Sequence, residues 1–475
     1  MNFYEAVVRF KKLDTEEDNR ICNVKEKHTM TAIDIFQGNQ IGGCITVIIA
    51  TRDNETHRIM IDYGESLPGC DNAEDFIYPW EQAPIDAVFF THYHGDHVGR
   101  IMDIPDNIPI YMGETARKIM LNIHEHLSYI EGAEGEFHKR VHQLLSDDNR
   151  IHTFHYNSDR RYYDVVGDIP FFSIEPYSVD HSAYDAYMFL IEADDETKET
   201  GKKVIVHTGD FRGHGRRGKA MLKMIYYYIH KNHREIDVLI IEGTMMSRLS
   251  EDVKTEAQMQ AEATEYLREH KHVFLICSST NLDSLTSFYQ AWQSASLPYR
   301  GYMYTYSRYF EKQLRTFSDT AGRFSDVYQF DNVYHLDLDR QFHHDKWSVS
   351  KTQKELMKEN GFLTIIKPEL FCEKYIDAFM YCDDKPVIIY SMWDGYLNPE
   401  HKAYNKVWHE FLKAQEAKGI EVKHLHTSGH ATSKMIADVI KAMNPKEEII
   451  PMHTECPEEF MKLDIGEELK NKIRM

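Results

Sequence analysis

The sequence predicts an α/β layered fold, because short apolar segments alternate along the chain with amphipathic segments of helical period. Each apolar segment has the length of a buried strand and ends in polar or glycine-containing residues. Strands that alternate with helices build layered folds in which the helices cover the sheets. The expected strands are 45–50, 59–61, 85–90, 204–206, 238–241, 274–277, 387–390 and 449–450, and the expected helices include 114–127, 220–232, 255–270 and 434–443.

The segment between residues 246 and 405 differs in composition from the rest of the chain. It is rich in aromatic residues and contains no cluster of metal-binding side chains. Histidine-containing motifs precede it and return after it, in HLHTSGHA and PMHTE. A site that is split around a long interval indicates an inserted domain. The expected bounds are 1–30 for an N-terminal extension, 31–245 and 406–475 for the two parts of one domain, and 246–405 for the inserted domain.

The composition limits the class of protein. The chain has 475 residues, enough for two or three domains. Its formal net charge of −21 argues against tight, nonspecific binding of long duplexes, although a nuclease with a local basic groove is compatible with it. One basic patch is present; its residues are Arg212, His214, Arg216, Arg217 and Lys219.

Neither a membrane segment nor a disulfide framework is expected. The chain lacks a run of about 18 apolar residues, and its first residues lack the apolar core of a secretory signal, so we expect a cytoplasmic protein. The seven cysteines are scattered and form no CxxC pair, which argues against both disulfides and a thiolate zinc site. They are Cys22, Cys44, Cys70, Cys277, Cys372, Cys382 and Cys456.

Four potential metal ligands lie within six positions, directly after the expected strand 85–90. They are His92, His94, Asp96 and His97, in the sequence THYHGDHVG. Imidazole and carboxylate groups hold zinc or manganese at neutral pH. Because Gly95 permits a sharp turn, the first two histidines can face one ion while the following pair faces another.

A two-ion centre needs further ligands, and three more candidates each follow an apolar run. His181 follows FFSIEPYSVD, Asp210 follows VIVHTG and His453 follows EEIIPM. Acidic residues also end two expected strands, at Asp62 and Glu242. Strands that deliver polar side chains at one end build active sites in layered α/β folds. The sequence therefore predicts that these residues converge.

This order of motifs resembles a known family. Asp62, the HxHxDH run, His181 and Asp210 resemble the metallo-β-lactamase superfamily. Glu242 in LIIEGT, His430 in HTSGHA and His453 in PMHTE resemble three motifs of its β-CASP nucleases, and the similarity to ribonuclease J extends over residues 34–460. The resemblance implies a metallo-β-lactamase αββα sandwich with an inserted α/β β-CASP domain.

The resemblance also implies residue roles around two divalent ions, with zinc favoured over manganese. His92, His94 and His181 would hold the first ion, and Asp96, His97 and His453 the second. Asp210 would bridge both ions, while Asp62 and Glu242 would orient the ligands. His430 would face the scissile phosphate, as would His426, and the histidine in the last motif favours RNA over DNA.

Three departures from the ribonuclease J pattern are visible. Thr454 replaces a glycine of the last motif, which could narrow the groove. The expected phosphate pocket of the inserted domain contains Ser279, Thr280 and Asn281 but continues with Asp283, an acidic residue that argues against binding of a 5′-phosphate. The chain also stops soon after the last motif, where ribonuclease J has an assembly domain; a homodimer remains possible.

The predicted function is hydrolysis of single-stranded RNA by water that two metal ions activate. Arg212, Arg216 and Arg217 could grip flanking phosphates. The aromatic residues at 302–310 could stack bases, although packing is the commoner role, and we expect 226–228 to pack as well. The alternatives are a hydrolase of a small ester, lactone or nucleotide, and an inactive RNA-binding scaffold.

Overall fold

The computed structural model describes residues 30–53, 55–67, 76–155, 166–232, 234–249, 252–295, 302–336, 351–368 and 370–475. Most of the predicted N-terminal extension, together with Cys22 and Cys70, lies outside these residues. The described cysteines are free. No helix in the described part of the chain has the length and apolar character that a membrane crossing requires.

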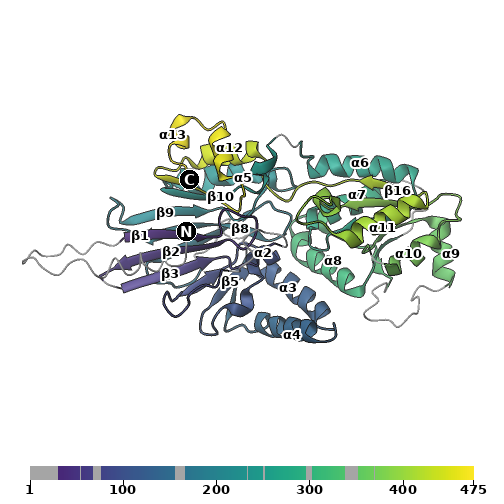
Figure 1. The fold of residues 1–475 in the computed structure, drawn as a ribbon, viewed down its shortest axis with the longest axis horizontal. Helices are drawn as coiled ribbons and strands as arrows, with labels where there is room; N and C mark the ends of the chain where they lie inside the picture. Colours follow the sequence, from purple (N-terminus) through teal and green to yellow (C-terminus); the bar gives the residue numbers. More distant parts are fainter. Residues whose placement is uncertain are drawn as a thin grey trace, which may run out of the picture.

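Two sheets stack face to face and form the first layered unit (Figure 1). The first sheet has the order β1-β2-β3-β4-β5-β6 and the second has the order β17-β10-β9-β8-β7. The strands of the first sheet are β1 (Met30–Phe36), β2 (Ile45–Arg52), β3 (Glu55–Ile61), β4 (Ala87–Phe89), β5 (Ile110–Gly113) and β6 (Ile151–Phe154). Those of the second are β7 (Phe172–Val179), β8 (Ala186–Asp194), β9 (Lys202–His207), β10 (Val238–Glu242) and β17 (Glu448–Met452).

Alternating side chains explain why these segments form sandwiched strands. In β10, Val238 and Ile240 pack between the two sheets, whereas Leu239 and Ile241 face the opposite side. This period of two gives each strand two buried faces, one toward the other sheet and one toward a helix layer. Helices α3 (Glu114–Leu127) and α4 (Ala133–Leu145) cover the first sheet, and α5 (Gly218–Met224) and α12 (Ser433–Met443) cover the second. The result is the predicted αββα sandwich.

The third sheet belongs to an additional α/β unit on the right of Figure 1. All its neighbouring strands are parallel, in the order β13-β12-β14-β11-β15-β16. The strands are β11 (His272–Cys277), β12 (Met303–Thr305), β13 (Val333–His335), β14 (Phe362–Ile365), β15 (Val387–Ser391) and β16 (Glu421–His424). The helices of this unit are α6 (Glu256–Glu269), α7 (Leu282–Ser294), α8 (Arg308–Thr320), α9 (Lys351–Asn360), α10 (Leu370–Asp377) and α11 (Lys406–Ala417).

Each of the expected strands overlaps a strand of the structure, and the four named helices are present. The expected helix 220–232 continues from α5 into a π-helix, η2 (Ile225–Ile229), and a short η3 (His230–Asn232). The third sheet extends past the boundary that we expected at residue 405, because β16 pairs in parallel with β15. We therefore propose that the inserted domain ends near His424. Short helices complete the chain at α2 (Gly95–Val98), η1 (Ile101–Asp103), η4 (Thr244–Arg248), η5 (Ala321–Arg323), η6 (Asp326–Tyr328), η7 (Asp394–Leu397), η8 (Pro457–Lys462) and α13 (Glu467–Lys470).

Candidate metal centre

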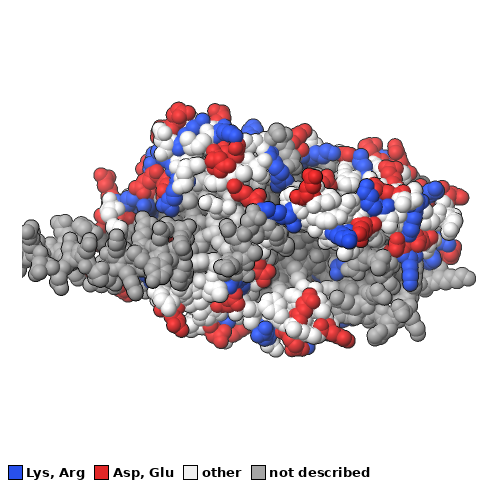
Figure 2. Space-filling view, in the orientation of Figure 1, with Lys and Arg blue, Asp and Glu red and all other residues white. Residues whose placement is uncertain are grey.

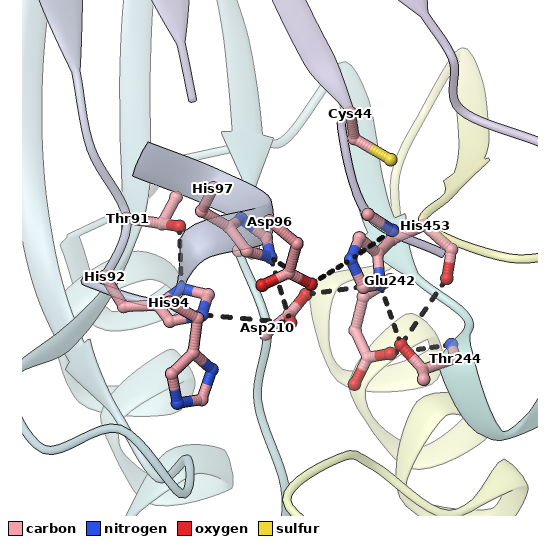
Figure 3. A network of polar contacts seen from close by, with 12 residues as sticks. Cys44, Thr91, His92, His94, Asp96, His97, Asp210, Glu242, Thr244 and His453 are labelled. Carbon is pink, nitrogen blue, oxygen red and sulfur yellow. Dashed lines mark hydrogen bonds and ion pairs between the residues drawn. The ribbon is translucent and has the colours of Figure 1, made fainter. Parts of the chain in front are cut away.

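The candidate metal ligands come from strand ends that meet at one edge of the sandwich. Strands β3 and β4 run parallel and lead to Asp62 and to the loop at 91–97. Strands β9, β10 and β17 also run parallel, and they lead to Asp210, Glu242 and His453. Figure 3 shows side chains from both sheets directed toward Asp210. Residues that are far apart in sequence therefore converge, as the spacing predicted.

One group of donor atoms consists of His92, His94 and His181, whose ligand atoms all lie within 4.8 Å of one another. The His181 Nε2 and His94 Nδ1 atoms are 3.3 Å apart. The Nδ1 atom of His181 donates to the backbone oxygen of Gly429, 2.6 Å away, which leaves Nε2 directed into the group. Burial and the neighbouring imidazoles hold the pKa of His92 and of His181 well below the ordinary value, so these rings are neutral and able to bind a cation.

A second group consists of Asp96, His97 and His453. His453 Nε2 lies 3.2 Å from Asp96 Oδ2, and His97 Nε2 lies 3.2 Å from Asp210 Oδ2. His92 Nε2 is 4.0 Å from the same Asp210 oxygen. Asp210 is thus adjacent to both groups.

The donor set fits divalent cations. It combines imidazole nitrogens with the carboxylates of Asp96 and Asp210, a mixture that suits zinc and manganese. His92 Nε2 and Asp210 Oδ1 are buried without a hydrogen-bond partner among the described residues, although buried polar atoms are normally paired. Although burial opposes charge on these groups, His453 and His97 lower the pKa of Asp210, and the carboxylates of Asp210 and Asp62 raise that of His97. Convergent donors of this kind form a cluster that is able to bind metal ions.

Asp62 orients His97 within the second group. Its Oδ2 atom accepts a hydrogen bond from His97 Nδ1 at 2.8 Å, which directs Nε2 toward Asp210. Thr91 holds the carboxylate in place, since its backbone N–H and its hydroxyl each donate to Asp62 at 2.8 Å. Asp62 has a φ of 60°, a left-handed conformation that non-glycine residues rarely adopt and that is common at functional sites.

Glu242 connects the end of β10 to the loop that carries His430. The fully buried carboxylate accepts hydrogen bonds from the backbone N–H groups of Thr244 at 2.8 Å and Ala431 at 3.0 Å. His430 Nδ1 lies 3.5 Å from Asp210 Oδ2 and 3.8 Å from Glu242 Oε1. Although burial opposes its charge, these two carboxylates raise the pKa of His430, which favours an imidazolium beside the cluster.

Two residues that the sequence did not single out contact His453. The hydroxyl of Thr244 lies 2.9 Å from His453 Nδ1 and holds the ring, whereas the backbone N–H of Gly42 donates to Nε2 at 3.1 Å and would give up this bond to a cation bound there. His453 itself has a φ of 52°. The position of Thr244 at the end of the LIIEGT motif was the one sequence feature that could have identified it. Nothing in the sequence near Gly42 indicated a contact with a histidine. The next residue, Thr454, is buried. Its backbone φ is not in the left-handed region, so this position does not require the glycine that ribonuclease J has there.

Arg212 does not lie where a substrate phosphate could reach it. The side chain is fully buried, and its Nη2 atom lies 2.8 Å from Asp283 and 3.2 Å from Glu256. Its Nε atom is 3.6 Å from Asp180, and Nη1 donates to the backbone oxygen of Ser428. We therefore correct the expected phosphate contact of Arg212, because its charge is neutralised inside the protein.

The same contacts change the interpretation of Asp283. Its buried carboxylate faces Arg212 and the backbone N–H of Arg216, and although burial opposes the charge, Arg212 lowers its pKa. The acidic side chain is therefore not available to repel a phosphate, so Asp283 does not argue against a 5′-phosphate pocket as predicted; the pocket itself stays a prediction. Asn281 caps α7 by accepting from the backbone N–H of Ser284, so its oxygen is engaged as well.

The other expected substrate contacts lie near the inserted domain. Ser279 is partly exposed in the loop after β11. The backbone oxygen of the adjacent Thr280 accepts a hydrogen bond from the hydroxyl of Tyr93, which lies in the sequence between two candidate metal ligands. Arg216 donates to Gln260 and Ser287 of the inserted domain, which competes with the predicted phosphate contact. His426 is partly exposed, and burial lowers its pKa to about 4.

Comparisons with known families agree with this geometry. Residues 43–150 match the metallo-β-lactamase superfamily, and residues 419–462 match the Zn-dependent metallo-hydrolase RNA specificity domain. The first match contains the loop at 91–97, and the second contains His426, His430 and His453. No curated protein sequence matches the chain significantly.

One solved structure shares the fold over most of its length, and two others match less than half of this chain. A protein of unknown function from Enterococcus faecalis V583 is 18% identical with a TM-score of 0.61, covering 91% of this chain and 95% of its own. The subclass B3 metallo-β-lactamase MEM-A1, from a soil metagenome library, is 12% identical with a TM-score of 0.27, covering 45% of this chain and 76% of its own. MIM-1 from Novosphingobium pentaromativorans is 16% identical with a TM-score of 0.25, covering 43% and 73%.

A His/Asp cluster able to bind metal lies at the edge of an αββα sandwich, and an additional α/β unit separates the two family matches in the sequence. The chain belongs to the metallo-β-lactamase superfamily, as a metal-dependent hydrolase with the RNA specificity domain that is typical of β-CASP, ribonuclease J-like proteins.

Proposed function

We propose that the chain is a two-metal phosphodiesterase that hydrolyses single-stranded RNA. The observation that carries this proposal is the position of His430 beside Asp210. His430 belongs to the segment that matches the RNA specificity domain. An imidazolium at the metal cluster suits an anionic phosphodiester, whose charge it neutralises. The comparisons support an RNA substrate through the second family match.

The candidate ligands divide between two sites. His92, His94 and His181 would hold one cation, and Asp96, His97 and His453 the other, with Asp210 shared between them. Zinc is the favoured ion, since imidazole donors predominate, and manganese is the alternative. When bound, two such ions would lower the pKa of water and neutralise charge on the phosphodiester.

The protein groups around the cluster have separate tasks. Asp62 and the Gly429 carbonyl fix the rings of His97 and His181 so that one nitrogen of each faces the centre. Glu242 holds Ala431, and therefore the neighbouring His430, against the end of β10. The His430 imidazolium would contact the phosphate and donate its proton to the departing oxygen.

A cleavage assay tests this function. The protein, reconstituted with Zn²⁺ or Mn²⁺, is incubated with single-stranded RNA, single-stranded DNA and bis(p-nitrophenyl) phosphate, and its metal content is measured in parallel. RNA should be cleaved, and product mapping on 5′-monophosphate, 5′-triphosphate and 5′-hydroxyl RNAs would distinguish internal from terminal cleavage. Turnover of a small ester or lactone without RNA cleavage would contradict the proposal, as would less than one bound metal equivalent per chain with RNA binding alone.

His430→Ala provides the sharper variant. Loss of the proton donor should slow RNA cleavage by about 10²- to 10⁴-fold. The metal content should stay unchanged, since His430 is assigned to the phosphate. His155→Ala is the matched control, because that histidine is exposed on the surface. A loss of metal in His430→Ala would instead make His430 a ligand, in the group that it forms with His181 and Asp210.

A further inference from the structure

Residues 211–234 contain no acidic side chain, although the whole chain has 76 Asp and Glu against 55 Lys and Arg. This segment begins directly after Asp210 and includes α5, η2 and η3. Helix α5 lies beside α12 in Figure 1, on the side of the sandwich that faces α6. The charge of this segment therefore differs in sign from that of the protein as a whole, and it starts at the metal cluster.

The outer side of this segment is exposed. Tyr226 and Tyr227 are 59% and 54% exposed, contrary to the packing expected for 226–228 from the sequence. Only Tyr228 packs inward, with its ring centroid 5.8 Å from that of Tyr177. The π-helical turn η2 widens the helix at these tyrosines, and such turns are frequent at functional sites. We define the α5–η3 face as the exposed residues Lys219, Leu222, Lys223, Tyr226, Tyr227 and Lys231.

The lysines of this face differ from most other exposed lysines. Figure 2 shows basic and acidic side chains mixed over the surface in view. Lys118, Lys434 and Lys462, for example, each lie 2.6 Å from a carboxylate of their own helix. No described carboxylate forms an ion pair with a lysine of the α5–η3 face, and Lys231 instead lies over the ring of Tyr227 at 5.7 Å.

We propose that the α5–η3 face binds the single-stranded RNA that flanks the scissile phosphate. This inference rests on the proposed function and adds a second contact surface to it. Lysines without ion pairs attract phosphates, and exposed tyrosine rings stack on unpaired bases. A protein partner fits the composition less well, because lysine is depleted in protein–protein interfaces.

The chain segment between Asp210 and this face is short, and side-chain contacts hold it in place. Two contacts hold the loop after Asp210 in place. His214 Nε2 donates a hydrogen bond to the backbone oxygen of Ser428, and the Arg217 guanidinium lies over the ring of Tyr184. Helix α5 then begins at Gly218, eight residues after Asp210. Tyr226 lies about 12 Å further along the helical segment, at a rise of about 1.5 Å per residue. A long RNA held at the cluster has flanking nucleotides that such a face could bind, whereas a dinucleotide has none beyond the scissile phosphate.

Substrates of different length test the proposal. The double variant Tyr226→Ala/Tyr227→Ala should raise KM for a long, unstructured RNA at least about 5-fold, the smallest effect expected for loss of one stacked base. Its kcat/KM for a dinucleotide and for bis(p-nitrophenyl) phosphate should be unchanged. Tyr381→Ala is the matched control, since Tyr381 is 98% exposed on the inserted domain. An equal KM for long RNA in the wild type and the double variant would overturn the proposal.

Salt dependence tests the lysines separately. Replacing Lys219, Lys223 and Lys231 with Gln should reduce the slope of log affinity against log salt by about 2 for single-stranded RNA. Lys413→Gln is the control, because Lys413 lies on α11, outside the α5–η3 face, and its replacement should leave the slope unchanged. Affinity is measured by fluorescence anisotropy with a phosphorothioate RNA that resists cleavage.

The anisotropy measurement also separates this inference from the proposed function. If the wild type cleaves no RNA, the proposed function fails, while reduced affinity of the tyrosine variant would still support the face. Unchanged affinity in both sets of variants would contradict the face even if RNA is cleaved. A change in oligomeric mass of the tyrosine variant, with unchanged RNA affinity, would overturn it in favour of contact with a second copy.

Discussion

Two buried polar clusters lie next to each other in this protein, and they differ in how their charges are satisfied. The metal cluster contains His181 and Asp210, and the second cluster surrounds Arg212 and contains Asp180. Neighbouring residues of the same two loops therefore serve different clusters. In the metal cluster, imidazoles and carboxylates point at one another with donor atoms left unpartnered. In the Arg212 cluster, a cation lies among three carboxylates.

This difference separates a ligand site from a structural network. Buried polar atoms without partners are costly, so a group of them that converges indicates a binding site for something absent from the chain itself. In the Arg212 cluster, both Asp180 oxygens and Arg212 Nε also lack a hydrogen-bond partner, so the clusters differ in their counter-charge instead. The guanidinium is a built-in cation that lies within 3.6 Å of each of the three carboxylates, and the hydroxyl groups of Ser284 and Ser287 also bond Glu256. The Arg212 cluster joins the sandwich to helices α6 and α7 of the additional α/β unit, because Glu256 lies on α6 and Asp283 on α7.

The largest effect on turnover is expected from removal of the carboxylate that both donor groups of the metal cluster share. Asp210→Ala should lower turnover by at least about 10⁴-fold, because both groups of donor atoms lose their common oxygen ligand. Metal content, measured by atomic absorption after reconstitution, should fall together with activity. Asp464→Ala, at a fully exposed site, should change neither quantity. Full activity of Asp210→Ala would remove the proposed bridging role and the distinction between the clusters.

The next effect breaks the Arg212 cluster. Arg212→Met should lower the free energy of unfolding by about 3–5 kcal/mol, because it leaves buried carboxylates without a counter-charge. Chemical denaturation at neutral pH measures the change. Arg315→Met is a matched control, since Arg315 is mostly exposed. A change below about 1 kcal/mol, the range of surface ion pairs, would show that the cluster contributes little to stability.

The pH dependence of the same variant has a definite sign. Burial already raises the pKa of Asp180 and of Glu256, and removing Arg212 should raise both further. A carboxyl group with a raised pKa in the folded state contributes fully at low pH, and its contribution is lost as pH rises through that pKa. The destabilisation by Arg212→Met should therefore shrink as the pH falls from neutrality toward about 4, the ordinary pKa of these groups. An equal penalty across this interval would contradict the assignment.

The metal cluster was predictable because each ligand has a local signal. The HxHxDH spacing and the apolar runs before His181, Asp210 and His453 identify strand ends, and parallel strands bring those ends to one edge. The Arg212 cluster has no comparable signal. Its partners at Asp180, Glu256 and Asp283 lie in separate elements, so their proximity depends on the packing of the third sheet.

Short length and surface exposure explain why other parts of the fold could not be predicted from the sequence. Strands β12 and β13 have three residues each, too few for a periodic pattern. Strand β16 has exposed or half-exposed residues throughout, so its sequence does not indicate that it closes the third sheet. The exposure of Tyr226 and Tyr227 was missed because three consecutive tyrosines in a helical segment usually include a packed side. A π-helical turn changes which side is buried.

The smallest expected effect concerns orientation within the metal cluster. Asp62→Asn keeps the size of the side chain, and Asn tolerates the left-handed backbone at this position. If the amide nitrogen faces His97, it cannot accept the hydrogen bond from Nδ1 that directs Nε2 toward Asp210. Metal affinity should fall by about 10- to 100-fold, while excess Zn²⁺ restores most of the activity. Calorimetric titration of the metal-free protein measures this affinity, with the surface variant Asp106→Asn as control. An unchanged affinity would mean that the unpartnered donors of the cluster need no oriented imidazole, and that their convergence alone suffices to hold the ions.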